Sequence, residues 1–295
     1  MRAEAPYTPP MMHVADRLLS AVQRCGAPLC VGLDPVVGKL PAALQTLGAT
    51  KPASAIESFS LAVLAACVRV APVVKIQSAC YERYGVDGMK ALAATLESAR
   101  EHGYEVILDA KRGDIGISAE HYAAAAFAAA RADWVTVNAY LGADGLAPFV
   151  KHDHGAFALV RTSNPGGDAL QSLRLSDGRS VAEAVADLVA DAGKATLGGA
   201  GYSSLGAVVG ATKPADAARL RGRMPHTLFL VPGYGAQGGG IADIKPCFNA
   251  DGRGAIITAS RSIIYAFTND DDDWAGSIRR AAETTHRELA EGLRA

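Results

Sequence analysis

Short apolar runs alternate with longer, alanine-rich segments along most of this chain. The runs are rich in Val, Leu and Ile, and polar residues rarely interrupt them. Continuous apolar runs of this length predict strands that are buried on both faces, as in a parallel sheet. Eight such strands are expected: Leu29–Leu33, Val73–Ile76, Val106–Leu108, Trp134–Val137, Phe157–Val160, Ala207–Val209, Leu228–Val231 and Ala255–Ile257.

The segments between the runs predict helices. Two of them follow the spacing of a capping box: Ser54 with Glu57 before Ser58–Val70, and Ser180 with Glu183 before Val181–Gly193. Further helices are expected at Gly88–Glu101, Ser118–Arg131 and Ala215–Arg221, the last opened by Pro214. Alternation of strand and helix implies right-handed parallel crossovers. Eight such units predict an α/β protein with a closed (β/α)8 barrel, and an open doubly wound sheet is the runner-up.

No composition break divides the chain into domains. Its 295 residues fit one barrel of about 250 residues with insertions. We therefore expect a single domain over 1–295, with a short N-terminal extension at 1–12 and a C-terminal helix at about 274–293. The polar stretch Thr162–Arg179 is long for a barrel loop and directly follows a strand. Loops of this length are usually functional or disordered, and this one should lie on the catalytic face.

Composition and charge exclude several classes of protein. The apolar fraction is 49%, the charged fraction 20% and the net charge −1, so no basic excess indicates nucleic acid binding. The acidic run Asp270–Asp273 is expected to cap the last helix. Five cysteines without CxxC spacing argue against a disulfide framework or a zinc site. We expect no signal peptide in Met1–Met12, no membrane span, and a cytoplasmic protein with reduced thiols.

Charged residues cluster where the first three strands end. Asp34 follows the first strand, Lys75 lies in the second, and Asp109 and Lys111 follow the third. Because side chains alternate along a strand, all four should point towards the barrel axis, while their apolar neighbours meet the helices. Burying these charges is tolerable only in a network of alternating sign. A purely structural ion-pair lattice is the alternative, but active sites of barrels lie at the carboxyl ends of the strands.

The last two strands end in residues suited to a phosphate. The seventh leads into the glycine-rich stretch 233–240, which contains Gln237, and the eighth leads into Ser260 and Arg261. Glycine lets backbone N–H groups approach oxygens closely, and a guanidinium matches phosphate geometry. The loops after strands seven and eight of barrels often bind phosphate. A merely flexible turn is the alternative interpretation of the glycines.

The string Asp109-Ala-Lys-Arg-Gly-Asp-Ile115, read at the end of a third strand, resembles the orotidine 5′-phosphate decarboxylase family. The resemblance is to the bacterial long-chain (type 2) branch in particular, and it spans the barrel from Asp34 to Arg261. The bare Asp-x-Lys-x-x-Asp spacing is shared with sugar-phosphate decarboxylases and aldolases, so the surrounding motifs make the resemblance specific.

This resemblance implies roles for the charged residues. Lys111 would protonate C6 of the pyrimidine as CO2 leaves, and Asp109 would face the substrate carboxylate. Lys75 would hold Asp109 and the ribose. Asp114 would reach into the site of the partner subunit in a homodimer. No metal and no organic cofactor would be needed, and the product would be UMP of the de novo pyrimidine pathway.

The resemblance also implies a set of substrate-binding residues. Asp34 would bind a ribose hydroxyl, and Ser163, in the stretch Thr162–Pro165, would bind the edge of the base. Ser118 stands where the family usually has a threonine that helps hold the neighbouring site's ligand. The 5′-phosphate would be held by Gln237, Ser260 and Arg261. Asn138 is a weaker candidate for lining the pocket, and a loop-capping role is equally compatible with its position.

Two other functions stay open. One is a metal-dependent sugar-phosphate decarboxylase or synthase of the same superfamily, although those enzymes usually carry an acidic residue where this chain has Lys75. The other is a non-catalytic barrel that binds a phosphate ligand. His152-x-His154 suggests a metal site, but these histidines precede the fifth strand and should lie on the opposite face of the barrel.

Overall fold

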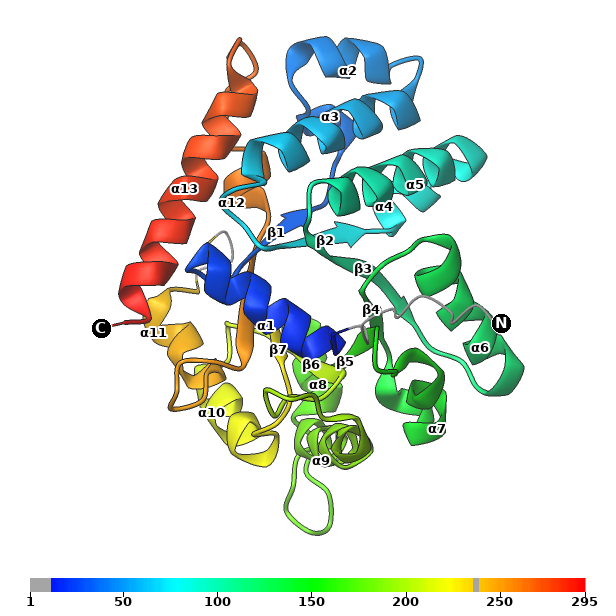
Figure 1. Ribbon diagram of the computed structural model, residues 1–295, viewed down its shortest axis with the longest axis vertical. Coiled ribbons are helices and arrows are strands. Elements are labelled where there is room, and N and C mark those ends of the chain that lie inside the picture. The colour runs from blue at the N-terminus through cyan, green and yellow to red at the C-terminus, as the bar shows by residue number, and fades with distance from the viewer. Residues whose placement is uncertain (1–11, 236–238, 295) are drawn as a thin grey trace, which may run out of the picture.

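The protein is a closed barrel of parallel strands in the computed structural model, which describes residues 12–235 and 239–294. The eight strands pair in chain order, β1 to β8, and β8 closes against β1 (Figure 1). The strands are β1 Leu29–Leu33, β2 Val73–Gln77, β3 Glu105–Arg112, β4 Trp134–Val137, β5 Gly155–Arg161, β6 Leu205–Val209, β7 Phe229–Pro232 and β8 Ala255–Ala259. The predicted (β/α)8 barrel is confirmed as a single domain, and the open sheet is excluded.

Helices surround the barrel (Figure 1). The α-helices are α1 Val14–Cys25, α2 Ala42–Gly48, α3 Pro52–Cys67, α4 Ala79–Glu82, α5 Gly85–Glu101, α6 Gly116–Ala124, α7 Ala143–Leu146, α8 Asp168–Gln171, α9 Val181–Gly193, α10 Pro214–Arg223, α11 Ile241–Ile244, α12 Arg261–Ile264 and α13 Trp274–Gly292. Short 3-10 turns occur at Val37–Lys39, Ala139–Leu141, Ala147–Phe149, Pro165–Gly167, Lys194–Thr196 and Lys245–Cys247. None of the helices in the described part of the chain is long and apolar enough to span a bilayer.

The two predicted capping boxes have different outcomes. Ser180 caps α9 as expected, because its hydroxyl accepts from the amide of Glu183 and the Glu183 carboxylate accepts from the amide of Ser180. The box at Ser54 is wrong, because α3 already begins at Pro52. Proline is favoured in the first turn, where its missing N–H costs nothing.

Two other helices differ from the expected form. The predicted helix Ser118–Arg131 consists of α6 followed by a π-helical turn at Ala125–Ala129. The last helix, α13, begins after Asp273, whose side chain accepts from the amide of Gly276. The acidic run before this helix therefore ends in a cap, as expected.

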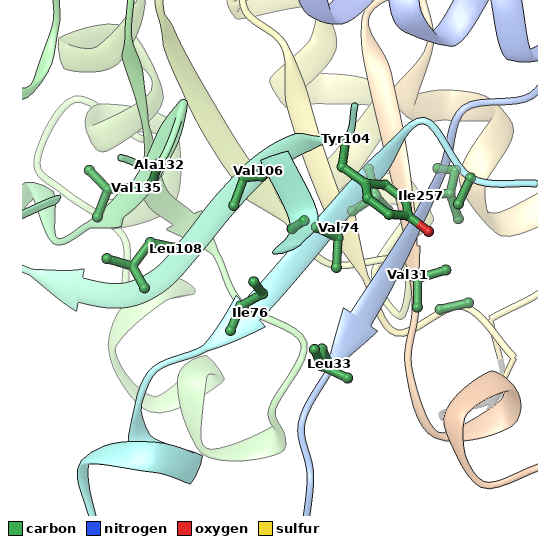
Figure 2. Packing of buried hydrophobic residues seen from close by; sticks show 14 of the residues in the cluster. Val31, Leu33, Val74, Ile76, Tyr104, Val106, Leu108, Ala132, Val135 and Ile257 are labelled. Atoms are coloured by element: carbon green, nitrogen blue, oxygen red, sulfur yellow. The ribbon is translucent and has the colours of Figure 1, made fainter. Parts of the chain in front are cut away.

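Alternation along the strands divides the apolar core into two clusters. Outward-facing residues such as Val31, Val74 and Val106 pack under the helices (Figure 2). Inward-facing residues such as Ile107 and Phe157 form a second cluster inside the barrel. The inner cluster fills the interior of the barrel near the amino ends of the strands, which leaves room inside the barrel near their carboxyl ends.

Helix α1 closes the amino end of the barrel. Its residues Val14, Ala15 and Leu18 belong to the inner cluster with Trp134. In Figure 1 this helix lies across the centre of the ring of helices. The expected extension at 1–12 falls almost wholly outside the described residues.

The histidine pair lies at this closed end, as expected. The carbonyl of His152 accepts from the amide of Val14 at 2.9 Å, and the His152 ring packs edge-on against that of His13. Within residues 12–235 and 239–294, no group of three or more His, Cys, Asp or Glu side chains is arranged to hold a metal ion.

Candidate active site

A cavity of about 260 Å³ opens at the carboxyl ends of the strands. One wall is charged and comes from the first strands, with Asp34, Lys75, Asp109 and Lys111. The floor is apolar and consists of Leu159, Val208 and Leu230. The remaining wall comes from the ends of β5, β7 and β8, with Thr162, Ser163, Asn164, Pro232, Gly233, Tyr234, Thr258, Ser260 and Arg261. The cavity therefore offers charge on one side and an apolar surface beneath it.

The charged wall is a network of alternating sign. Lys75 Nζ donates to Asp109 Oδ2 at 2.6 Å, and Lys111 Nζ donates to Asp109 Oδ1 at 2.6 Å. Lys75 Nζ also lies 3.7 Å from Asp34 Oδ1. Each oxygen of Asp109 thus has its own ammonium group. The inward placement that strand alternation predicted for these four side chains is confirmed.

The network fixes the charges of its buried members. Burial alone would lower the pKa of Lys75, but the carboxylates of Asp34 and Asp109 outweigh it and raise that pKa above its usual range. Burial would raise the pKa of Asp109, but Lys75 and Lys111 outweigh it and hold that pKa well below its usual range. Asp109 is therefore a carboxylate and Lys75 an ammonium at neutral pH.

Strand β3 is irregular where it carries Lys111. Its pairing with β4 shifts register between Leu108 and Arg112. Lys111 has a φ of 46°, in the left-handed region that residues with a side chain seldom occupy. Its amide donates to the hydroxyl of Thr136 at 2.9 Å. Our sequence interpretation ended this strand at Leu108 and missed Thr136, although alternation from the inward Trp134 would have placed Thr136 in the barrel.

Asp114 and Ser118 do not reach the cavity of their own chain. Asp114 lies in the turn after β3, where its carboxylate accepts from the amide of Ile115 at 2.9 Å. Ser118 is exposed on α6. Apolar side chains around them are also exposed, with Ile115 at 55% and Ile117 at 70%. One chain alone therefore leaves these two predicted site residues outside the cavity.

The proposed phosphate end is open to solvent. Ser260 and Arg261 line the cavity, and Arg261 is an exposed first residue of α12. Gly233 has a φ of 100°, which a residue with a side chain would rarely adopt. A second hollow of about 500 Å³ adjoins this end and is lined in part by Lys213 and Arg261. Gln237 lies outside the described residues.

The loop after β5 is held by a buried arginine. Arg161 is only 3% exposed and binds Asp168 at 2.5 Å and Asp216 at 2.7 Å. It also donates to Gln171, whose side chain in turn binds the amide and hydroxyl of Thr162. The long loop is thus ordered by hydrogen bonds, and Ser163 is presented to the cavity.

Asn138 does not line the cavity. Its side chain accepts from the amide of Tyr140 at 3.0 Å and caps the turn after β4. The capping role is therefore the one that the structure supports.

Two polar atoms in the walls of the cavity have no hydrogen bond. Among the described residues, Asp34 Oδ1 and Thr258 Oγ1 are buried without a hydrogen-bond partner. Both residues line the cavity. Buried polar atoms of this kind normally have a partner, so these two mark places where a ligand's polar groups could bind.

Comparisons with known proteins agree with this geometry. The family model described as orotidine 5′-phosphate decarboxylase / HUMPS family matches residues 27–271. The orotidine 5′-phosphate decarboxylase of Rhodopirellula baltica is 39% identical over 301 residues, which cover 95% of this chain and 99% of that protein. The protein of the same name from Ralstonia pickettii is 40% identical over 281 residues, covering 94% and 98%.

Solved structures give the same result. The orotidine-monophosphate (OMP) decarboxylase of Leishmania donovani superposes with a TM-score of 0.79 at 32% identity, covering 96% of this chain and all of that one, 100%. A putative orotidine 5′-phosphate decarboxylase from Streptomyces avermitilis gives a TM-score of 0.81 at 32% identity, covering 99% and 100%. The likeness therefore extends over the whole barrel.

Proposed function

Since the chain belongs to the orotidine 5′-phosphate decarboxylase / HUMPS family, we propose that the charged wall of its cavity removes CO2 from a pyrimidine nucleotide. The chain is a carboxy-lyase that converts orotidine 5′-phosphate to UMP and CO2, a step of pyrimidine biosynthesis. The observation that carries the chemistry is the Lys75–Asp109–Lys111 network, which faces the cavity. The long-chain branch is the subdivision that its sequence favours.

Lys111 is the acid of this reaction. When the bond from C6 to the carboxylate breaks, its electron pair stays on C6, where no π system delocalises it. An ammonium group fixed beside C6 stabilises this charge as it develops and then transfers a proton to it. CO2 leaves with the atoms of the carboxylate, and C6 gains one hydrogen. Lys111 suits this role because Asp109 holds its ammonium group at the cavity edge.

Asp109 and Lys75 prepare the site for that step. The Asp109 carboxylate is ionised, so it opposes the substrate carboxylate, and its Oδ1 holds the Lys111 side chain at 2.6 Å. Lys75 neutralises the other oxygen of Asp109 and lies near Asp34. Asp34 Oδ1 is the acceptor that we assign to a ribose hydroxyl.

The remaining groups bind the two ends of the nucleotide. Ser163 binds the edge of the base from the loop after β5. Arg261, the backbone at Ser260 and Gln237 bind the 5′-phosphate. Binding energy from this remote group can be used to align the reacting carbon.

We assign Asp114 and Ser118 to the site of a second copy of the chain. Neither residue reaches its own cavity, and both lie among exposed apolar side chains. An exposed apolar patch on a folded protein commonly marks an interface. A homodimer that buries this surface would place Asp114 beside the Lys111 of its partner copy.

A metal-dependent sugar-phosphate decarboxylase or synthase is the second candidate, because those enzymes share the Asp-x-Lys-x-x-Asp spacing of Asp109, Lys111 and Asp114. Lys75 argues against it, since an ammonium group occupies the place where a metal ligand would be needed. We therefore propose that no metal and no organic cofactor takes part. A cytoplasmic location fits the five cysteines, all of which are free.

One assay tests the function. Protein treated with a chelator is given orotidine 5′-phosphate, and the loss of substrate absorbance is followed. We expect turnover that added magnesium does not increase. No turnover would refute the proposed function, and turnover that requires magnesium would favour the second candidate.

Mixed dimers test the shared site. Asp114→Asn and Lys111→Ala chains are each inactive if both residues are required. In a mixed dimer, one site combines an intact Lys111 with the intact Asp114 of the other chain, so mixing should restore activity. If mixing restores none while size measurements show that mixed dimers form, Asp114 acts in its own chain or not at all.

A further inference from the structure

We propose that Thr136 is a positioning residue that holds Lys111 and Asp109 in their reactive arrangement. Thr136 lies on β4, is only 1% exposed and faces the inside of the barrel. The inference rests on the proposed function, because it assigns Thr136 a part in placing the acid. It concerns an uncharged residue that the charge pattern of the sequence does not reveal.

The hydroxyl of Thr136 joins the two catalytic groups. Its Oγ1 donates to Asp109 Oδ1 at 2.8 Å and accepts from the amide of Lys111 at 2.9 Å. The direction of both bonds is fixed, because an ionised carboxylate can only accept and an amide can only donate. The Thr136 hydroxyl therefore donates its one proton to the Asp109 carboxylate, and a lone pair of the same oxygen accepts the backbone amide of Lys111.

This hydroxyl replaces a missing bond of the sheet. Leu108 pairs with Val135 and Arg112 with Val137, so three residues of β3 face only Thr136 on β4. The amide of Lys111, the last residue of this bulge, donates to the Thr136 side chain in place of a backbone carbonyl. The backbone ladder resumes where the amide of Asn138 donates to the carbonyl of Arg112 at 2.7 Å.

The same bond supports a strained backbone. Lys111 has a φ of 46°, and such conformations persist only where the surroundings hold them. Without the hydroxyl, the Lys111 amide would lose its partner and the bulge could relax towards a regular strand. Asp109 Oδ1 would then keep only the Lys111 ammonium. The ammonium group would move with the backbone, away from the place where C6 is bound.

Three substitutions test this role. Thr136→Val keeps the shape and removes the hydroxyl, and Thr136→Ser keeps the hydroxyl and removes a methyl group. Thr136→Cys offers a weak donor of similar size. Because a misplacement of about 1 Å can cost about 100-fold in rate, we expect Thr136→Val to lower kcat by about 10- to 100-fold. KM should change by less than about threefold, since the bonds to the base and phosphate stay.

The expected order of kcat is Thr, Ser, Cys, Val. Thr95→Val is the matched control, because Thr95 is also fully buried and donates to a backbone carbonyl, that of Ala91, but on the outer helix α5. It should leave kcat and KM unchanged. If Thr136→Val does not fold, the Ser and Cys variants still give the order.

The inference is overturned if Thr136→Val keeps the kcat of the unaltered protein. It is also overturned if Thr136→Ser is as slow as Thr136→Val, because the methyl packing would then matter and not the hydrogen bonds. An increase in KM without a decrease in kcat would assign Thr136 to binding and refute positioning of the acid. Failure of the proposed function gives a different result, because the unaltered protein would then show no turnover. That result would refute both the proposed function and the role of Thr136.

Discussion

Strand β3 carries buried charges at both of its ends, and the two clusters differ in one instructive way. At its amino end, Glu105 accepts from Arg17 Nε at 2.8 Å, and the same arginine binds Asp133 at 2.5 Å. At its carboxyl end, Asp109 binds Lys75 and Lys111, each at 2.6 Å. In both clusters a carboxylate on β3 is paired with a cation from another element, Arg17 of α1 in one and Lys75 of β2 in the other.

The difference lies in what covers them. Helix α1 supplies Arg17 and closes the amino end, whereas the carboxyl end opens into the cavity. At the open end Lys111 is half-exposed and its backbone is strained. A buried ion cluster therefore does not mark an active site by itself. Access to a cavity and a strained residue distinguish the functional cluster from the structural one, whereas among the described residues a buried oxygen without a hydrogen-bond partner occurs in both, at Asp34 Oδ1 and at Glu105 Oε2.

Of the substitutions that test the contrast between the two clusters, removal of the Lys111 side chain should have the largest effect on kcat. We expect Lys111→Ala to lower kcat by at least about 1000-fold, because the acid and the charge that stabilises the carbanion are both lost. Steady-state kinetics measure this loss. The free energy of unfolding should change little, since the Lys111 side chain is half-exposed and Asp109 keeps its bond to Lys75.

Binding of UMP is the control for this variant. It should stay measurable, because the groups assigned to the phosphate and the base are intact. A Lys111→Ala protein with a kcat near that of the unaltered protein would show that the open cluster is as structural as the closed one.

The sequence predicted the open cluster better than the closed one, for a physical reason. The carboxyl-end residues follow apolar strands at short, regular spacing, so alternation alone places Asp109 and Lys75 inside the barrel. Arg17 is 88 residues from Glu105 along the chain, and its contact depends on how α1 docks. No local pattern encodes that docking, so this cluster was not predicted.

The irregular backbone of β3 likewise could not be predicted from local sequence patterns. All eight strands were predicted near their observed places, yet the continuation of β3 to Arg112 was not. The bulge depends on the partner strand, where the Thr136 hydroxyl receives the Lys111 amide. Asp114 and Ser118 show a similar limit, because their assigned roles need a second chain.

A change in Arg17 should affect stability and leave the chemistry intact. Arg17→Met leaves Glu105 buried without its cation, and Asp133 keeps the amide of Val106 at 2.8 Å and Arg100 at 3.7 Å. Removing one partner of a buried ion pair costs about 3–5 kcal/mol of unfolding free energy. We expect about 2–3 kcal/mol here, because the Arg17 side chain is 29% exposed. Urea unfolding measures the loss, and kcat at 25 °C should stay normal.

Arg24→Met is the matched control on the same helix. Arg24 binds only Ser20 at the surface among the described residues, so its loss should change stability by less than about 0.5 kcal/mol. If Arg17→Met lowered kcat without lowering stability, the two ends of β3 would be coupled, and the contrast between a structural and a functional cluster would fail.

The smallest expected effect is a dependence of stability on pH that comes from the closed cluster. Burial, reinforced by Asp133 and opposed by Arg17, raises the pKa of Glu105 to about 7. An unfolded glutamate titrates near about 4.3, so between these values the folded protein binds the extra proton. Stability from this group is therefore present at low pH and falls as pH rises towards 7.

Glu105→Gln removes that titration and keeps a neutral side chain of similar shape. We expect the variant to gain about 1–2 kcal/mol relative to the unaltered protein between pH 5 and pH 8, as measured by urea unfolding at both values. The effect of Asp109 on stability has the opposite sign, because the pKa of Asp109 is lowered in the folded protein. Its contribution to stability is present above the pKa of an unfolded aspartate and is lost only in strong acid. It therefore adds no slope in this window. An equal pH dependence of stability in the variant and the unaltered protein would show that Glu105 is ionised from pH 5 to pH 8. Arg17 would then stabilise the Glu105 carboxylate as fully as the two lysines stabilise that of Asp109.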